Sequence, residues 1–400
     1  MKINLGLLLG MVLVASLRIA MAADADVSKL AAANNNFSFK LLRQLVGEQA
    51  GKSVFVSPYS VATALQMVAN GGAGRTRSEM EQALETTNLS TAELSEATKF
   101  VAGLLSSNNT NLILSTANAL WYRQGTTLKT DFAAANQKYF QATIKALDFD
   151  NPAAAEAAIN QWASDQTHGR ITGIADGTVT PATDLILANA IYFKGKWVDP
   201  FDPAQTKDRP FHAATGADTD VPMMQMSETF MYRKGSSYQA VRLPYMGGDL
   251  AMYVFLPDPG SSPAKLLKIM NGDKWRRVTM PGFSGQPGMV VLPKFKLETT
   301  MELSSSLNDL GIKTAFSRSA DFSGMFNDAH RLSEVRQKAF VEVNEQGTEA
   351  AAVTEMQVEA AGIEMPPPKP FEMIVDRPFL FAIVDDRSEM ILFMGVVNEL

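Results

Sequence analysis

The first part of the chain carries apolar residues at the spacing of amphipathic helices. One helix is predicted from Asn36 to Gly47. A second is predicted to begin at Ser57-Pro58 and to end at Asn70-Gly71-Gly72, since proline suits a first helical turn and glycine suits a C-terminus. Thr76 is predicted to cap a third helix that runs to Leu84. Helical spacing and many alanines predict two more helices, at residues 91–105 and 152–165.

Beyond about residue 180 the pattern changes to short apolar or alternating runs, which are typical of strands. One short helix, Met301–Leu310, is predicted among them. Helices first and strands afterwards, with few alternations of the two, predict an α+β fold built on large, mostly antiparallel sheets. The predicted strands are Leu185–Phe193, Gln239–Leu243, Leu250–Leu256, Met289–Leu297, Lys338–Val343, Phe379–Val384 and Ile391–Val397.

Residues 1–22 have the pattern of a secretory signal peptide. Lys2 provides the charge, an apolar run follows from Ile3 to Leu17, and Ala20-Met21-Ala22 is a small-residue cleavage site. The apolar run is too short for a membrane span. We therefore expect an exported protein, secreted or periplasmic, whose mature chain begins near Ala23 and whose formal charge shifts from −6 to −8.

The composition of the 400 residues excludes several classes of function. The chain has no cysteine, which excludes disulfides, thiol nucleophiles and thiolate metal sites. The three histidines, His168, His212 and His330, are far apart, so we expect no metal site. The negative charge without a basic run argues against a nucleic-acid partner. The length exceeds that of a typical single domain, so two domains and one large core are both possible. The sequence has no clear linker and no internal repeat.

No sequence motif of an enzyme is present, and we expect no catalytic activity. Gly71-Gly72-Ala73-Gly74 follows a predicted helix rather than a strand, so a helix end and turn is the better interpretation than a phosphate-binding loop. Asp385-Asp386 lies between two predicted strands, where a solvated hairpin turn is expected.

The segment from Lys338 to Pro370 differs from an ordinary loop. A predicted strand ends at Asn344, and a turn follows at Glu345-Gln346-Gly347-Thr348. Residues 348–359 then alternate strictly. One parity is uncharged, with Thr348, Ala350, Ala352, Thr354, Met356 and Val358, and the other carries every charge of the segment. This is the period of a half-buried strand.

A helix is the alternative, because alanine, glutamate and methionine favour helices. On a helix, however, the charges of this segment would spread around the axis and leave no uncharged face. The triple proline Pro366-Pro367-Pro368 cannot join a central strand and is expected to be extended and exposed. The sequence therefore predicts a segment able to form a strand at the base of an exposed loop.

Several short motifs occur together along the chain. One is the loop base Glu345-Gln346-Gly347-Thr348-Glu349-Ala350-Ala351-Ala352. The others are Ser57-Pro58-Tyr59-Ser60, Asn189-Ala190-Ile191-Tyr192-Phe193-Lys194-Gly195-Lys196-Trp197, Leu292-Pro293-Lys294-Phe295, Asp321-Phe322-Ser323-Gly324-Met325, Arg377-Pro378-Phe379-Leu380-Phe381 and Phe393-Met394-Gly395. Their combination and order resemble the serpin family from Asn36 to Leu400, and the loop base matches the hinge of that family.

The resemblance implies an α+β serpin fold with about nine helices around three β-sheets and an exposed reactive-centre loop. It divides the chain into a signal peptide (1–22), an N-terminal lead (23–35) and a single domain (36–400) with the loop at about 345–370. It also implies that a protease cleaves the loop and becomes acylated. The loop then inserts into the main sheet as a new strand and distorts the trapped enzyme.

The resemblance assigns three groups of site residues in this sequence. The hinge comprises Glu345, Gly347, Thr348, Ala350, Ala351 and Ala352. The region that controls sheet opening comprises Ser57, Ser60, Asn189, Trp197 and Gln337, where Gln337 stands at the position of the usual histidine. Counting from Gly347, the reactive bond is Ala361-Gly362, which suits elastase-like or subtilisin-like enzymes.

Alternatives remain for the bond and for the function. Because the loop is longer than usual, the bond would move to Ile363, Glu364 or Met365 if the extra residues precede it, and a Glu-specific protease would cut at Glu359 or Glu364. A non-inhibitory binding or chaperone protein is the alternative function, and papain-like cysteine proteases are an alternative target. We expect a monomer without cofactor or membrane partner. We expect no heparin-type activator, because residues 91–108 hold no basic cluster.

Overall fold

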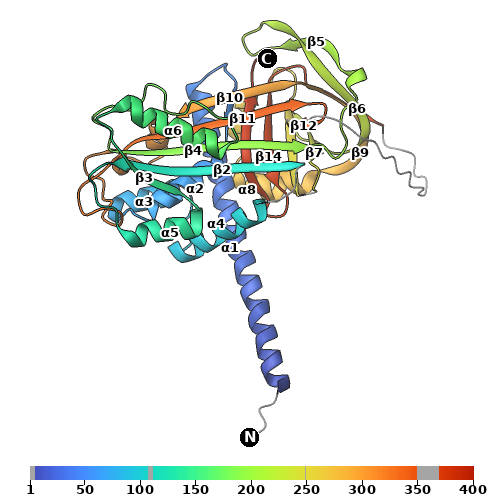
Figure 1. Ribbon diagram of the computed structural model, residues 1–400. Helices are drawn as coiled ribbons and strands as arrows, with labels where there is room; N and C mark the ends of the chain where they lie inside the picture. The colour runs from blue at the N-terminus through green and yellow to red at the C-terminus, as the bar shows by residue number, and fades with distance from the viewer. Residues whose placement is uncertain (1–4, 107–110, 248, 349–368) are drawn as a thin grey trace.

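The computed structural model of the chain describes residues 5–106, 111–247, 249–348 and 369–400. Helices gather on one side and two β-sheets form the rest of the body (Figure 1), so the α+β class is confirmed. The described residues include nine α-helical segments: α1 Leu5–Glu48, α2 Pro58–Ala69, α3 Gly74–Ala83, α4 Thr91–Leu105, α5 Thr130–Phe140, α6 Pro152–Gln166, α7 Pro263–Ile269, α8 Gly272–Lys274 and α9 Ser304–Asp309.

Strands dominate the described chain beyond residue 180, as predicted, but three shorter or unpredicted ones, β1, β2 and β3, precede that point. The strands are β1 Val54–Val56, β2 Leu112–Arg123, β3 Thr143–Leu147, β4 Leu185–Lys196, β5 Lys207–His212, β6 Asp218–Lys234, β7 Tyr238–Pro244, β8 Leu250–Pro257, β9 Ser284–Pro293, β10 Phe295–Glu302, β11 Leu332–Asn344, β12 Gly347–Thr348, β13 Phe371–Ile374, β14 Phe379–Asp385 and β15 Met390–Val397.

The larger sheet has nine strands and is continuous through β6. The 17-residue strand β6 pairs with β5 near its start, with β9 along its middle and with β7 at its end. It thereby joins an outer portion, which includes β13, to an inner portion of β7, β8, β14, β15 and β1. With the six-stranded sheet, this makes the three sheet portions that the resemblance implies.

The six-stranded sheet has the order β10-β11-β12-β4-β2-β3. Its central strands β4 and β11 are parallel and pair directly from Leu185 and Leu332 up to Tyr192 and Phe340. Above that point the short strand β12 lies between them and pairs antiparallel with both. We call the boundary between β4 and β11 the seam.

Helix α2 forms where the sequence predicts it. Ser57 caps its N-terminus, Pro58 occupies the first turn, and all its residues are buried beneath the seam. The turn at Gly71-Gly72 after this helix confirms the helix-end interpretation of the glycines.

Two local predictions are wrong. The third helix begins at Gly74 after Ala73, and Thr76 is buried inside it. The hydroxyl of Thr76 accepts a hydrogen bond from the backbone of Asp321 at 2.8 Å, so a tertiary contact fixes this helix start. The strand predicted from Met289 to Leu297 is two strands, β9 and β10, which separate at Lys294 and enter different sheets.

The pair Asp385-Asp386 is near a turn but is not solvated. Asp385 is fully buried and accepts the hydroxyl of Ser388 at 2.6 Å. Asp386 accepts Arg242 at 2.5 Å and the hydroxyl of Tyr253 at 2.8 Å. Asp385 therefore holds the turn together from within, and Asp386 ties it to the neighbouring strands β7 and β8.

Helix α1 contains the N-terminal segment to which a signal peptide was assigned. The start of this helix projects away from the body (Figure 1). Later in the helix, Val27, Leu30 and Ala31 are buried, before the start of the helix predicted at Asn36. None of the helices in the described part of the chain combines the length and apolarity that a membrane span requires.

Candidate functional site

The upper end of the seam holds the base of the predicted loop. Gly347 pairs with Lys196 of β4 and Asn344 of β11, and Thr348 pairs with Gly195 and Val343. Thr348, the first residue of the alternating segment, is therefore already part of a strand inside the sheet, together with Gly347 of the predicted turn. The predicted tendency of this segment to form a strand is confirmed for Thr348, the one residue of the segment that the structure describes.

Gly347 is the residue at which the chain turns into the sheet. Its φ is +142°, and a Cβ atom at this position would lie 2.1 Å from the carbonyl oxygen of Gly195. Any other residue would therefore combine backbone strain with a steric clash. The entry of β12 into the seam depends on glycine here.

Thr348 is completely buried, and its hydroxyl lies 2.8 Å from the phenol oxygen of Tyr245. The Tyr245 ring stacks on Trp197 with centroids 4.6 Å apart, and the indole of Trp197 donates to the carbonyl of Asn344 at 3.0 Å. Burial raises the pKa of Tyr245 well above its usual range, so the phenol keeps its proton. The side chain of Thr348 thus points into the core.

Glu345 anchors the turn before β12. Its carboxylate lies 2.9 Å from the ammonium of Lys294 and accepts the hydroxyl of Thr206 at 2.9 Å. Burial alone would raise the pKa of Glu345, but these donors outweigh it and lower the pKa below the usual range. The carbonyl of Glu345 also accepts the backbone N–H of Phe201 at 2.8 Å.

A second group of site residues meets midway along the seam. Gln337 accepts the backbone N–H of Ser57 at 2.8 Å and donates to the Ser57 carbonyl at 3.0 Å. The same amide donates to Asn189 at 2.7 Å. Asn189 in turn donates to the hydroxyl of Ser60 and to Asn118 at 2.7 Å. The four residues assigned here from the resemblance, Ser57, Ser60, Asn189 and Gln337, are in one buried network.

This network crosses the seam. Asn189 belongs to β4, Gln337 belongs to β11, and the two are direct register partners. Their side-chain bond must break if the strands separate. Gln337 replaces the expected histidine and still satisfies donors and acceptors on both sides, because its amide can donate and accept.

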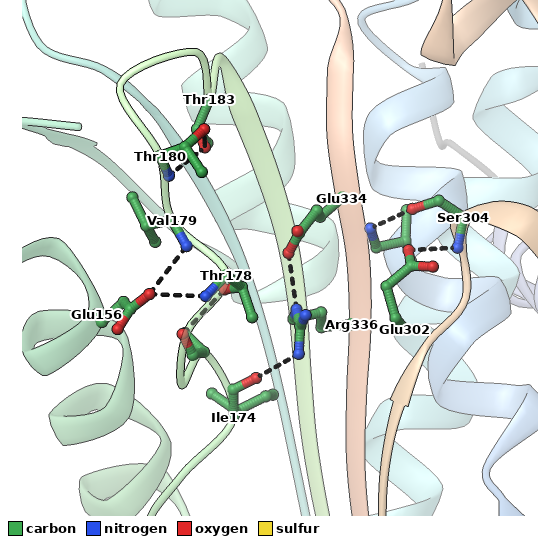
Figure 2. Close-up of polar contacts among 12 residues, drawn as sticks. Glu156, Ile174, Thr178, Val179, Thr180, Thr183, Glu302, Ser304, Glu334 and Arg336 are labelled. Carbon is green, nitrogen blue, oxygen red and sulfur yellow. Dashed lines mark hydrogen bonds and ion pairs between the residues drawn. The ribbon is translucent and has the colours of Figure 1, made fainter. Parts of the chain in front are cut away.

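The front of the sheet is covered by α6 and the segment 171–179. Their apolar side chains pack on β2 and β4, in a cluster to which β11 contributes no residue. Two long basic side chains of β11 reach this cover. Arg336 donates to the Ile174 carbonyl at 3.3 Å (Figure 2), and Lys338 donates to the Gly173 carbonyl at 3.1 Å. The cover is therefore packed on the β4 side of the seam and is joined to β11 by those two bonds.

Several assigned residues lie outside the described part of the chain. They are Ala350, Ala351 and Ala352 of the hinge, and Ala361 and Gly362 of the reactive bond. Ala361-Gly362 therefore stays a prediction. Among the described residues, no group of three or more histidine, aspartate or glutamate side chains is arranged to hold a metal ion.

The sequence did not identify Tyr245, Thr206 or Lys294 as partners of the hinge. Each lies 50 or more positions from its partner in sequence, and none has a local pattern that marks it. For Lys294 the sequence offered one sign of importance, because this residue lies within the motif Leu292-Pro293-Lys294-Phe295.

Comparisons with known proteins agree with this geometry. Residues 32–400 match the family model described as Serpin (serine protease inhibitor). Iripin-2 from the tick Ixodes ricinus is 36% identical, with 94% of each chain covered. The thermophilic serpin Tengpin, solved in its native state, superposes with a TM-score of 0.84 at 29% identity, covering 93% of this chain and 94% of its own. Human thyroxine-binding globulin, solved with its hormone, gives a TM-score of 0.84 at 28% identity and coverages of 94% and 99%.

Proposed function

Because the chain belongs to the serpin family, whose members are typically inhibitors rather than catalysts of proteolysis, we propose that it is a suicide-substrate inhibitor of serine proteases. The protease cleaves the loop and forms an acyl-enzyme. The freed loop then enters the seam as a full strand and carries the enzyme with it. The observation that carries this proposal is β12, which has the first two residues of that strand between β4 and β11.

The register of β12 supports full insertion. If the pairing of Thr348 with Gly195 and Val343 continues, Ala350 would come opposite Phe193 and Val341, and Val358 would come opposite Leu185 and Ser333. Eleven residues at about 3.3 Å each would therefore fill the seam to its lower end. The alternating segment has the length that this requires.

The orientation of Thr348 supports the same proposal. Its side chain is buried against Tyr245, and residues of the same parity would turn to the same side. That parity holds only uncharged residues from Thr348 to Val358. The charged parity would face the opposite side, where α6 and its loop cover the sheet.

One inserted residue would meet the buried network. In this register Thr354 comes opposite both Asn189 and Gln337, whose mutual bond must break when the strands separate. A hydroxyl can both donate and accept. Thr354 can therefore replace the partners that these two amides lose, which keeps the opened sheet free of unsatisfied polar groups.

The finer expectations follow the same proposal. The reactive bond is Ala361-Gly362, and the target is an elastase-like or subtilisin-like enzyme with a shallow pocket for a small side chain. The protein acts as an exported monomer. The start of α1, which projects from the body, is consistent with a removable signal peptide (Figure 1).

The direct test is incubation with elastase, subtilisin, trypsin, chymotrypsin and papain, followed by denaturing gels and mass determination of the released peptide. A covalent complex that survives denaturation, and a peptide beginning at Gly362, are expected with elastase or subtilisin. Cleavage by every enzyme without complex, and without a rise in the thermal unfolding midpoint, would instead identify a non-inhibitory binding or chaperone protein.

A variant of the buried hinge residue tests the insertion step. Thr348→Arg would place a charge where the side chain has no access to water, so the loop should be cleaved without trapping the protease. We expect the yield of complex to fall at least about tenfold, because burying an unpaired charge costs several kcal/mol. Thr348→Val has the same shape without the hydroxyl and is the matched control. It should keep most of the yield, and equal yields for both variants would refute insertion.

A further inference from the structure

The lower end of the seam is closed by a single aspartate that joins the starts of both central strands. Asp184 directly precedes β4, and its backbone N–H donates to the hydroxyl of Ser333 at 2.9 Å. Its carboxylate accepts the imidazole Nδ1 of His330 at 2.7 Å and the backbone N–H of Arg331 at 2.8 Å. His330 and Arg331 directly precede β11.

The imidazole of this group is buried, and the carboxylate is partly exposed. The side chain of His330 is 9% exposed and that of Asp184 is 21% exposed. The imidazole packs on the Phe326 ring with centroids 4.4 Å apart, and its Nε2 is buried with no partner among the described atoms. A carboxylate only accepts, so Nδ1 is the donor. Asp184 is therefore the group that fixes the orientation of His330.

The position of these contacts corresponds to the last step of strand entry. In the register of β12, the inserted strand ends opposite Leu185 and Ser333. The pairing of β4 with β11 shifts register between Leu332 and Glu334, so that Ser333 is left out of the ladder and its hydroxyl is available to Asp184. Irregular pairing of this kind is common next to functional sites.

We propose that Asp184, with His330 and Ser333, is a positioning group that keeps the lower seam closed and sets the rate of the final step of insertion. This rests on the proposed function. All three contacts join the β4 side to the β11 side, so all three are lost when a strand separates them. They stabilise the closed state only and contribute nothing to the loop-inserted state.

The proposal is tested by comparing the intact protein with protein whose loop has been cut by a non-target protease. Asp184→Ala should lower the thermal unfolding midpoint of the intact form by about 3 °C and leave that of the cut form within about 1 °C of wild type. At a temperature below unfolding, the intact variant should also convert to a non-inhibitory, heat-resistant form about ten times faster, as expected for the loss of the two charge-assisted hydrogen bonds that the carboxylate accepts.

Glu156→Ala is the matched control. The Glu156 carboxylate accepts two backbone N–H groups, those of Thr178 at 2.7 Å and Val179 at 2.9 Å (Figure 2). Both partners lie on the β4 side of the seam, so these bonds persist after insertion. This variant should lower the midpoints of the intact and cut forms equally. Equal lowering by Asp184→Ala would show that Asp184 is merely structural and would overturn the proposal.

Ser333→Ala and His330→Ala each remove one partner of Asp184. They replace Asp184→Ala in this test if that variant does not fold. Each should show the same selective effect at smaller size, and an equal effect on both forms would contradict the proposal. The wild-type protein separates this inference from the proposed function. If cutting the loop of wild type does not raise the midpoint, insertion itself is absent, whatever the variants do.

Discussion

Gln337 is the residue at which this chain departs most clearly from the pattern that the resemblance implied. The amide is 1% exposed and bonds to both sides of the seam. An amide does not titrate, so the buried network has the same charge at every physiological pH. A histidine in its place would change charge between about pH 5 and 8.

Gln337→His is therefore expected to introduce a pH dependence. The network holds no carboxylate and is buried, so burial disfavours the imidazolium and places the histidine pKa in the folded state below its value of about 6.5 in the unfolded state. The neutral imidazole then contributes its full stability above the unfolded-state pKa of about 6.5. This stability is lost as the pH falls from there through the folded-state pKa. Between pH 8 and 5 the variant should lose about 1–2 kcal/mol of unfolding free energy relative to wild type.

Urea unfolding of both proteins at pH 8, 6.5 and 5 measures this difference. Wild type is the control, because it holds the same three other histidines, His168, His212 and His330. Parallel pH profiles would show that position 337 is not isolated from solvent as described.

At the residue scale, the resemblance selected residues that lie in one buried network but did not select the partners of the hinge. Ser57, Ser60, Asn189 and Gln337 are joined by hydrogen bonds, and each lies within a recognisable short motif or at a fixed distance from one. Tyr245 and Thr206 have no such motif, and only the path of the chain brings them to Thr348 and Glu345. Periodicity indicates which face of a strand is buried, but it does not name the residue on the opposing element.

At the scale of elements, one glutamate joins α3 to the loop after α9. The Glu79 carboxylate accepts the backbone N–H groups of Lys313 at 2.8 Å and Thr314 at 2.6 Å, and it pairs with Arg75 at 2.7 Å. Burial opposes ionisation, but these donors outweigh it and lower the pKa of Glu79 from 4.5 to about 2. The carboxylate is thus held ionised in the folded state.

Acid should release this contact. Because the folded-state pKa is lower than the unfolded-state pKa, the unfolded chain binds more protons between them, and stability falls as the pH falls from about 4.5 toward 2. Glu79→Gln should remove about 1 kcal/mol of this dependence between pH 5 and 3, after allowance for solvent screening. Chemical unfolding at both pH values gives the measurement. Glu81→Gln, on the same helix and paired with Arg77, is the control, and an equal effect of both variants would contradict the assignment.

Element boundaries follow the sequence where local chemistry sets them. Ser57-Pro58 and Asn70-Gly71 delimit α2 because a cap and a glycine turn act locally. The start of α3 and the break at Lys294 do not follow from local pattern, since contacts with Asp321 and Glu345 decide them. The same holds for β2, whose apolar run lies among helices and becomes a strand through its pairing with β4.

At the scale of the whole molecule, the proposed mechanism requires β4 and β11 to separate. Ala339 and Ile191 are register partners across the seam, and the chain has no other cysteine to interfere with a new disulfide. Ala339→Cys with Ile191→Cys should, when oxidised, turn the inhibitor into a substrate, because the linked strands cannot admit a third. The yield of protease complex on denaturing gels measures this, and reduction should restore it.

A disulfide between Ala117→Cys and Ala190→Cys is the matched control. These residues pair across β2 and β4, which belong to the same side of the seam and need not separate. The oxidised control should inhibit normally. Undiminished inhibition by the oxidised seam variant would show that the sheet does not open along this line.

The two-residue strand β12 also has a kinetic consequence. A new strand normally begins with an unfavourable nucleation step, in which several backbone angles are fixed before many bonds form. In the proposed mechanism this step precedes the encounter with the protease, since Gly347 and Thr348 already pair with both neighbours. After cleavage only propagation remains, and we expect it to proceed without a lag. Substitutions near Thr348 then determine whether strand insertion starts. Substitutions near Leu185 determine whether insertion finishes before the acyl-enzyme is hydrolysed.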